Sequence, residues 1–380
     1  MTTIYESDDL AAIRVEIRRF VEDQVLSRGE AWEAAGEVPR QVLLDMGAIG
    51  FFGLRVPEEY GGVGMGHLAS VVMAEEFGRS TFGGFSITSL VHTDLAMPYV
   101  VNFGSDEQKR AWLPSMLTGE TLTAIGVTEP DAGSDVAAIR TTARRDGDGH
   151  RLNGTKLYIT NGGIADMVFI AARTDLEVKA SRGISIFAVE KGTPGFEASR
   201  ALSKMGWKSS NTAELVLDDC WVPDSHIVGE LDRGFYSIMH NFQNERLVIM
   251  AMAVGEAAKA IELTVEWVRN RKAFGSSLWS KQAIRQRLAM HAAEVEAARL
   301  LVYDAAWRAD RGEDVVKQVS MCKALAGELV NAVLYDCVQF HGGMGYLTES
   351  PIERMYRDAR IHSIGGGATE VMLDEIAKRM

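Results

Sequence analysis

Two short segments of the chain concentrate residue types that can bind a flat, polar ring. They are 125–135, IGVTEPDAGSD, and 158–163, YITNGG. Hydroxyl groups can hydrogen-bond ring heteroatoms or phosphate oxygens, glycine lets backbone approach a ligand, and tyrosine offers a face for stacking. Either segment alone is equally well interpreted as a polar turn of a β domain. Together they indicate a cofactor site, whose candidate contacts are Thr128, Gly133, Ser134, Tyr158 and Thr160.

At this spacing the two segments closely resemble the flavin-binding signatures of the acyl-CoA dehydrogenase family. The resemblance runs from about Phe20 to the C-terminus and is closest to the long-chain and isovaleryl-CoA branch. It implies an FAD-dependent enzyme that oxidises an acyl-CoA thioester between Cα and Cβ to the 2,3-enoyl-CoA. Such a reaction needs a base for the α proton and flavin N5 as the acceptor of the β hydride.

The proton-abstracting glutamate of many family members lies in a C-terminal loop of the form Ile-Tyr-Glu-Gly-Thr. The matching stretch here, 364–368, reads IGGGA, so Gly366 stands in the place of that glutamate. The long-chain and isovaleryl branch carries its base in a Glu-Arg-Leu context, which 244–248, NERLV, matches. The resemblance therefore implies Glu245 as the base, while the N–H of Gly366 still polarises the thioester carbonyl. An isolated glutamate near a helix start is more commonly solvated.

The resemblance implies FAD contacts from separate parts of the chain. The first group lies in the two opening segments: Ile125, Val127, Thr128, Gly133, Ser134, Tyr158 and Thr160. A second group resembles segments that reach the FAD of a neighbouring subunit: Arg271, Phe274, Lys281, Gln282, Gln339, Gly342 and Gly343. Thr369 and Glu370 match the final adenosine- and phosphate-side contacts. Arg271 suits a pyrophosphate because its forked guanidinium is permanently charged, although a lone arginine commonly forms a surface ion pair.

The implied substrate contacts are Ser134, Phe242, Arg246 and Gly365. Gly365 stands where an aromatic residue usually lines the acyl pocket, so we expect a wider pocket here. The substrate expected from the resemblance is a medium- or long-chain acyl-CoA. The alternative within the family is a branched, terpenoid or sterol-side-chain acyl-CoA.

Other function classes remain open from the residues alone. A non-catalytic subunit that binds acyl-CoA or FAD in a hetero-oligomer would fit the missing loop glutamate, but Glu245 in its Glu-Arg-Leu context argues against it. An oxidase that reacts with dioxygen and a flavin monooxygenase of the same fold are less favoured. The resemblance implies a homotetramer that passes electrons to an electron-transfer flavoprotein.

Composition favours an ordinary globular enzyme. The 380 residues are 47% hydrophobic, and the formal net charge of -12 argues against nucleic acid as the main partner. No run approaches the roughly 18 apolar residues of a membrane span, and no leader pattern opens the chain, so we expect a cytoplasmic protein. The scattered cysteines Cys220, Cys322 and Cys337 indicate neither a disulfide framework nor a metal site.

The order of elements predicts an α+β multidomain protein. Helical spacing follows a cap at Ser7, β-rich runs cover 167–172, 183–189 and 213–222, and Asn153-Gly154 predicts a hairpin turn. We therefore predict an N-terminal α-helical domain (1–120), a central β-barrel-like domain (121–227) and a C-terminal four-helix bundle (228–380). This is the order of the acyl-CoA dehydrogenase fold, in which the central domain holds both flavin segments.

Overall fold

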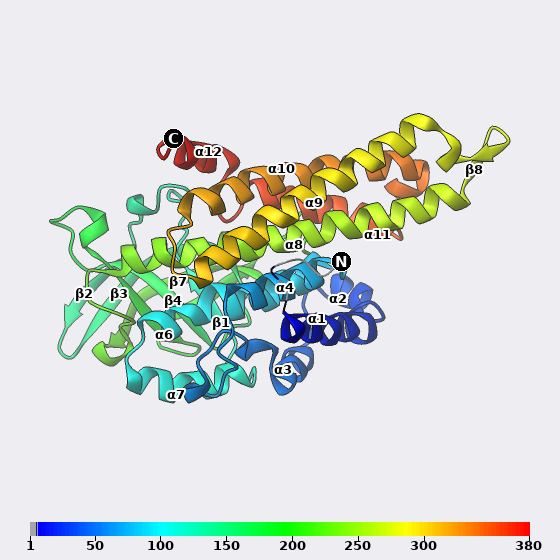
Figure 1. The fold of residues 1–380 in the computed structure, drawn as a ribbon. Coiled ribbons are helices and arrows are strands. Elements are labelled where there is room, and N and C mark those ends of the chain that lie inside the picture. Colours follow the sequence, from blue (N-terminus) through cyan, green and yellow to red (C-terminus); the bar gives the residue numbers. More distant parts are fainter. Residues whose placement is uncertain (1–4, 6) are drawn as a thin grey trace.

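The computed structural model describes residues 5 and 7–380, which form a helical region, a curled sheet and a second helical region (Figure 1). The first helix begins as predicted, because the Ser7 side chain accepts a hydrogen bond from the N–H of Leu10. The N-terminal helices are α1 (Asp8–Phe20), α2 (Gly29–Ala35), α3 (Arg40–Ile49), α4 (His67–Gly78), α5 (Gly83–Leu90), α6 (Met97–Phe103) and α7 (Asp106–Leu117). A π-helical segment, Val91–Ala96, joins α5 to α6.

The central region is a seven-stranded sheet in which β1, β4, β2, β3, β7 and β6 follow one another and β5 pairs with β4. Its strands are β1 (Thr123–Gly126), β2 (Thr142–Asp146), β3 (Gly149–Thr160), β4 (Met167–Arg173), β5 (Ile184–Glu190), β6 (Phe196–Ala201) and β7 (Thr212–Pro223). Strands β4, β5 and β7 fall on the three predicted β-rich runs. Both cofactor segments lie on this sheet, one after β1 and the other at the end of β3.

The predicted hairpin turn at Asn153-Gly154 is wrong. These residues lie inside β3, and the turn falls at Gly147-Asp148, where Asp146 pairs with Gly149. Gly154 instead marks an irregularity in the pairing of β3 with β7, with a positive φ of 153° and the side chain of Thr141 packed against it. A glycine flanked by strand residues can thus serve a bulge as well as a turn.

The C-terminal region is a bundle of long helices, drawn from yellow-green to red in Figure 1. Its elements are α8 (Gly234–Asn270), β8 (Lys272–Ala273), β9 (Ser276–Ser277), α9 (Gln282–Asp310), α10 (Val316–His341), α11 (Pro351–Ala359) and α12 (Thr369–Ala377). Leu288, Val295 and Val302 are buried on one face of α9, as their spacing predicts. The β8–β9 hairpin projects from the end of the bundle that is far from the sheet (Figure 1).

The predicted fold class is confirmed, with α8 as the element that joins the regions. Helix α8 packs closely on α4, where a Cβ on Gly78 would lie 2.1 Å from the Met252 carbonyl oxygen and one on Gly255 would lie 2.0 Å from the Glu75 carbonyl oxygen. Only glycine permits so close an approach of two backbones. The cysteines Cys220, Cys322 and Cys337 are buried and free. Within residues 5 and 7–380, none of the helices is long and apolar enough to cross a membrane.

Candidate active site

Glu245 lies on α8, where its side chain is partly buried. No described residue donates a hydrogen bond to its carboxylate, and burial raises the pKa of Glu245 to about 7. The cations Arg246 and Lys323 oppose this rise without cancelling it. A carboxyl group with such a pKa can accept a proton near neutral pH and release it again.

The glycine loop that follows α11 faces this carboxylate. A Cβ built on Gly366 would lie 3.6 Å from Oε1 of Glu245 and 3.1 Å from Cδ1 of Ile249, so the loop backbone packs closely beside the carboxylate. Gly366 has a φ of +66°, a conformation that other residues seldom adopt. The Nε of Arg246 donates a 3.2 Å hydrogen bond to the Gly366 carbonyl and so ties the loop to α8.

Several buried polar atoms on α8 and on α5 and α6, which contact it, have no hydrogen-bond partner among the described residues. They are the Tyr99 hydroxyl, the Thr88 hydroxyl, and the side-chain oxygens of Asn241 and Asn244. Burial and the nearby Glu245 carboxylate raise the pKa of Tyr99. Native proteins rarely leave such groups unpaired, so this part of the molecule is built to meet a polar ligand or water. The sequence analysis missed all four residues.

The two predicted flavin segments are fastened to each other. The N–H of Leu157 donates a 2.9 Å hydrogen bond to the Thr128 carbonyl. Fully buried Lys156 donates to the Val127 carbonyl at 3.2 Å and to the Glu129 carboxylate at 2.7 Å. Glu129 also accepts from the N–H groups of Arg140 and Thr141, which orders the rest of the first segment. This buried ion pair is a second feature that the sequence analysis missed.

The groups on these segments that point outward fit a bound flavin. Tyr158 is 65% exposed although Ile159 beside it is buried, and its φ of +62° sets it apart from the strand that it ends. Gly133 has open space where a Cβ would be, and the hydroxyl of exposed Ser134 has no partner among the described residues. Ile125 and Thr160 are partly buried beside them. An uncovered aromatic ring beside free hydroxyls suits a flat, polar cofactor.

A second group of predicted FAD contacts lies far from this sheet within one chain. Trp267 links them: its indole N–H donates to the Phe340 carbonyl, and the Arg271 guanidinium lies 6.0 Å from its ring. Phe274, at the tip of the β8–β9 hairpin, is 98% exposed, and Lys281 lies 5.9 Å from its ring. The exposed residues Gln282, Gln339, Gly342 and Gly343 belong to the same end of the bundle (Figure 1).

The remaining predicted residues lie close to the glycine loop. The Arg246 guanidinium lies 5.4 Å from the ring of Phe242, one turn earlier on α8. Gly365 packs on Ile361, and Thr369 opens α12, where its hydroxyl donates to Glu328 at 2.9 Å. Glu370 is exposed in the first turn of that helix. The structure thus gathers Glu245, Arg246, Phe242, Gly365 and Gly366 in one place.

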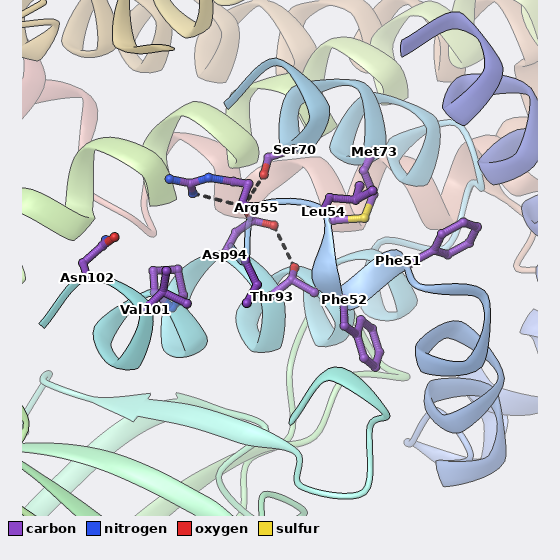
Figure 2. Close-up of a pocket in the computed structure, with 12 residues that line it drawn as sticks. Phe51, Phe52, Leu54, Arg55, Ser70, Met73, Thr93, Asp94, Val101 and Asn102 are labelled. Atoms are coloured by element: carbon purple, nitrogen blue, oxygen red, sulfur yellow. Dashed lines mark hydrogen bonds and ion pairs between the residues drawn. The ribbon is translucent and has the colours of Figure 1, made fainter. Parts of the chain in front are cut away.

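A small polar cavity lies on the other side of Asn244, between the segment 51–56 and the π-helical turn (Figure 2). Asp94 accepts hydrogen bonds there from Ser70 at 2.6 Å and from Thr93 at 2.7 Å, and Arg55 lies 3.6 Å away. Asn244 donates to the Asp94 carbonyl at 2.8 Å. With about 50 Å³ the cavity can hold water but not an acyl chain, so it supports the helix that carries Glu245.

The exposed Tyr158 on the curled sheet, the helical regions around that sheet and the partly buried Glu245 beside a loop of glycines fit a flavin-dependent dehydrogenase of acyl thioesters. Family models agree with this class along the whole chain. The acyl-CoA dehydrogenase N-terminal domain matches residues 7–120, the middle domain 124–220 and the C-terminal domain 232–380. The chain belongs to the acyl-CoA dehydrogenase family.

Individual relatives support the same membership. The mitochondrial long-chain specific acyl-CoA dehydrogenase of Sus scrofa is 39% identical over 97% of this chain and 85% of its own length. The mitochondrial isovaleryl-CoA dehydrogenase of Pongo abelii is 34% identical over 96% of this chain and 87% of its own. An acyl-CoA dehydrogenase from Geobacillus kaustophilus has a similar structure, with a TM-score of 0.95 and 38% identity, covering 100% of this chain and 99% of that one. The chain is therefore an oxidoreductase that uses FAD and dehydrogenates acyl-CoA.

Proposed function

We propose that Glu245 is the base of this dehydrogenase and that the backbone N–H of Gly366 polarises the thioester carbonyl. The observation that carries the proposal is the 3.6 Å separation between Oε1 of Glu245 and a Cβ built on Gly366. The helix therefore supplies a carboxylate beside the loop position where many relatives carry one. The pKa of Glu245, which burial raises to about 7, suits a base that works near neutral pH.

The reaction converts the Cα–Cβ single bond into a double bond. Glu245 takes the α proton as the Cα–H bond breaks, and the N–H of Gly366 stabilises the negative charge that develops on the carbonyl oxygen. FAD, when bound, supplies the acceptor for the hydride that leaves Cβ. The electron pair of the broken Cα–H bond then forms the new double bond. The substrate thus loses one proton from Cα and one hydride from Cβ, which together are two protons and two electrons.

The substrate in this proposal is a medium- or long-chain acyl-CoA. Gly365, Gly366 and Gly367 give the loop no side chains, so we expect a wider acyl pocket than larger residues would leave there. This same feature favours the alternative of a branched, terpenoid or sterol-derived acyl group. Phe242 and Ser134 would contact the thioester arm, and Arg246, which already holds the Gly366 carbonyl, lies where it can also meet the CoA nucleotide.

The cofactor site in this proposal is completed by a second copy of the chain in a homotetramer. Arg271, Phe274, Lys281, Gln282, Gln339, Gly342 and Gly343 would reach the FAD that the partner's sheet holds, while Thr369 and Glu370 would contact its adenosine side. Their exposure at the far end of the bundle supports this arrangement. The proposal assigns domains to 1–120, 121–227 and 228–380, the cytoplasm as location and an electron-transfer flavoprotein as acceptor.

An anaerobic screen of acyl-CoA thioesters tests the proposal most directly. The purified holoenzyme is mixed with straight-chain substrates of increasing length and with branched and sterol-derived ones, and the flavin absorbance is followed. Bleaching with medium and long straight chains is the expected result. A preference for branched or polycyclic thioesters would support the alternative, and a chain that bleaches with none of them, or that holds no FAD alone, would identify a non-catalytic subunit.

A further inference from the structure

Helix α10 carries a row of residues that seats the glycine loop. Lys323, Gly327 and Asn331 follow one another at intervals of four and so share one face of the helix. A Cβ on Gly327 would lie 2.8 Å from the His362 carbonyl oxygen, and the Asn331 amide donates to the Ala359 carbonyl at 3.2 Å. The segment that leads to Gly366 therefore rests directly on this face.

Lys323 is the charged member of the row and is fully buried. Its ammonium donates a hydrogen bond to the His362 carbonyl, its one hydrogen-bond partner among the described residues. Its Cε lies 3.8 Å from a Cβ built on Gly366, the same point that lies 3.6 Å from Oε1 of Glu245. The carboxylate of Glu245 and the side chain of Lys323 thus both approach the loop at Gly366.

We infer that Lys323 is a positioning residue of this active site, which anchors the glycine loop through the His362 carbonyl and acts electrostatically on Glu245 beside Gly366. No direct ion pair joins the two side chains within residues 5 and 7–380, so the cation acts through space. The inference extends the proposed function, because it concerns the same carboxylate.

The other charged groups near this pair are few. Arg246 follows Glu245 on α8 and Tyr99 faces it from α6, while Glu328 lies one turn and a half beyond Lys323 on α10. The loop itself carries His362, whose Nε2 lies 2.8 Å from the buried Glu256 carboxylate. Burial and Arg246 lower the pKa of Lys323 to about 8, and Glu245 opposes that change. The negative charge of Glu245 thus helps to keep Lys323 protonated.

Three substitutions at Lys323 separate its electrostatic effect on Glu245 from its hydrogen bond to the loop. Lys323→Met removes both the charge and the donor, Lys323→Gln removes the charge but keeps an amide that can donate to the His362 carbonyl, and Lys323→Arg keeps both. Lys317→Met is the control on the same helix, because Lys317 is partly exposed and donates to the Arg379 carbonyl at 3.3 Å and to no residue of the glycine loop. It should leave the titration of Glu245 unchanged.

The measurement is the pH titration of Glu245 in the holoenzyme. Infrared difference spectra follow its protonated carboxyl band, which is identified by its loss in Glu245→Gln, and the rate of flavin reduction by an acyl-CoA is measured over the same pH range. In Lys323→Met and Lys323→Gln, both curves should move to higher pH by about one unit, a tenfold change in proton affinity, because a stabilising cation is gone. Lys323→Arg should restore the original position.

An unchanged infrared titration in both Lys323→Met and Lys323→Gln would overturn the inference. If Lys323→Met does not fold, Lys323→Gln and Lys323→Arg decide the matter alone. If the carboxyl titration shifts while the rate profile does not follow it, the electrostatic role of Lys323 stands and the assignment of Glu245 as base fails. The loop-anchoring part predicts a KM for acyl-CoA that rises more in Lys323→Met than in Lys323→Gln, and equal values would remove that part.

Discussion

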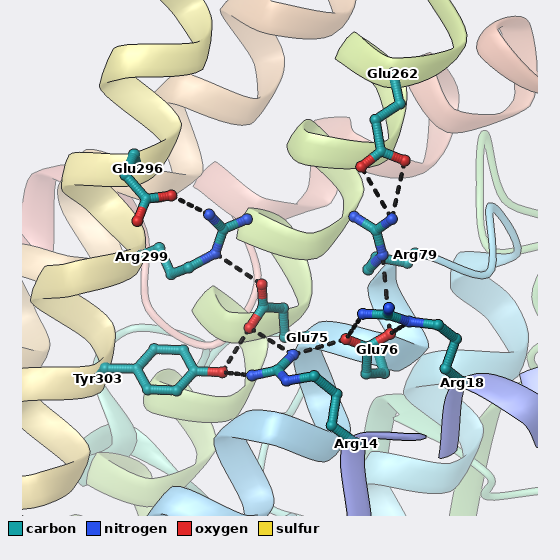
Figure 3. A network of polar contacts seen from close by, with 9 residues as sticks. All are labelled: Arg14, Arg18, Glu75, Glu76, Arg79, Glu262, Glu296, Arg299 and Tyr303. Carbon is teal, nitrogen blue, oxygen red and sulfur yellow. Dashed lines mark hydrogen bonds and ion pairs between the residues drawn. The ribbon is translucent and has the colours of Figure 1, made fainter. Parts of the chain in front are cut away.

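Two carboxylate clusters, one centred on α4 and the other on α8, are built in opposite ways. The first joins α1, α4, α8 and α9 around Glu75 and Glu76, which are 4% and 1% exposed (Figure 3). Glu75 accepts from Arg299 at 2.8 Å and from the Tyr303 hydroxyl at 2.6 Å, and Arg14 adds a contact at 3.3 Å. Glu76 accepts from Arg14 and Arg18 at 2.7–3.0 Å.

The second cluster surrounds Glu245 and lacks this saturation. Its carboxylate has no hydrogen-bond donor among the described residues, and the Tyr99 hydroxyl and Asn241 side-chain oxygen near it are unpaired. The pKa values follow the difference. Burial raises the pKa of Glu75, but Arg299 and Arg14 outweigh that effect and lower it overall, whereas the pKa of Glu245 stays raised at about 7.

One fold thus holds carboxylates that stabilise it and a carboxylate that is available for proton transfer. A carboxylate paired with arginines is held ionised and adds rigidity, and its lowered pKa makes it a poor acceptor for a substrate proton. A carboxylate left without donors destabilises the fold when it ionises, and it is reactive for the same reason. The predictions below test this contrast between the saturated cluster and the unsaturated one.

The largest expected effect comes from Glu245→Gln. The amide keeps the shape of the side chain but cannot accept the α proton, so flavin reduction by an acyl-CoA should slow by about 10²–10⁴-fold with FAD still bound. Stopped-flow absorbance measures the rate. Glu370→Gln is the matched control and should affect cofactor retention more than the reduction rate. A Glu245→Gln enzyme that reduces its flavin as fast as the wild type would show that the base is another residue.

The next effect is on stability and belongs to the saturated cluster. Glu75→Gln leaves Arg14 and Arg299 without their shared anion, and the free energy of unfolding should fall by about 2–3 kcal/mol, below the value for a fully buried pair because both arginines are about one-fifth exposed. Urea unfolding of the holoenzyme gives the number. Exposed Glu266 on the same side of the bundle offers the control, since Glu266→Gln should change stability very little.

The sequence predicted those site residues that lie in short, recognisable segments, but not those whose partners are distant in the chain. The segments 125–135 and 158–163 and the pair formed by Glu245 and Gly366 were located because each rests on a short, local pattern. The fold class followed from the order of helical and β-rich runs. Lys323 was missed because its meaning depends on His362, 39 residues away, and on a helix face that no local pattern reveals.

Lys156 and the turn at Gly147-Asp148 were not predicted either, because their roles also depend on residues distant in the sequence. Lys156 reads as an ordinary strand residue until Glu129, 27 residues earlier, is seen beside it. The turn at Gly147-Asp148 was overlooked in favour of Asn153-Gly154, although both are turn signals, because only the pairing with β7 makes Gly154 a bulge. Local chemistry locates reactive groups, whereas long-range packing decides which of them are satisfied.

Arg271 tests whether an exposed charged side chain contributes to a cofactor site that two copies of the chain share. Arg271 is exposed and its described contact is with the Trp267 ring, so Arg271→Ala should leave the fold of the chain intact. If its partner is the pyrophosphate of FAD on a neighbouring copy, the change should weaken FAD binding by about 1.5–3 kcal/mol and loosen the tetramer. Dilution followed by light scattering and flavin fluorescence measures both. A variant that stays flavinated and tetrameric would contradict the shared site.

The two clusters should also respond to pH in opposite directions. The folded-state pKa of Glu245 is raised, so its contribution to stability is present at low pH and is lost as pH rises through about 7. The pKa of Glu75 is lowered, so its contribution is present at neutral pH and is lost on acidification. The Tm of Glu245→Gln minus that of the wild type should therefore increase as pH rises from about 4.5 to about 7 and level off above it. A constant difference across that range would mean that Glu245 is not buried as an unpaired acid.

The smallest expected effect is a partial rescue that moves the carboxylate from the helix to the loop. Glu245→Gly should abolish most flavin reduction, and adding Gly366→Glu should restore a fraction, with preference shifted toward shorter or unbranched thioesters because the new side chain narrows the acyl site. The recovery is limited by geometry: Gly366 has a φ of +66°, and a Cβ there lies 3.1 Å from Ile249, so the loop must shift. An error of about 1 Å can slow a reaction about 100-fold. If the double variant binds FAD and acyl-CoA yet reduces no faster than Glu245→Gly with any thioester, the two positions do not serve one reacting carbon.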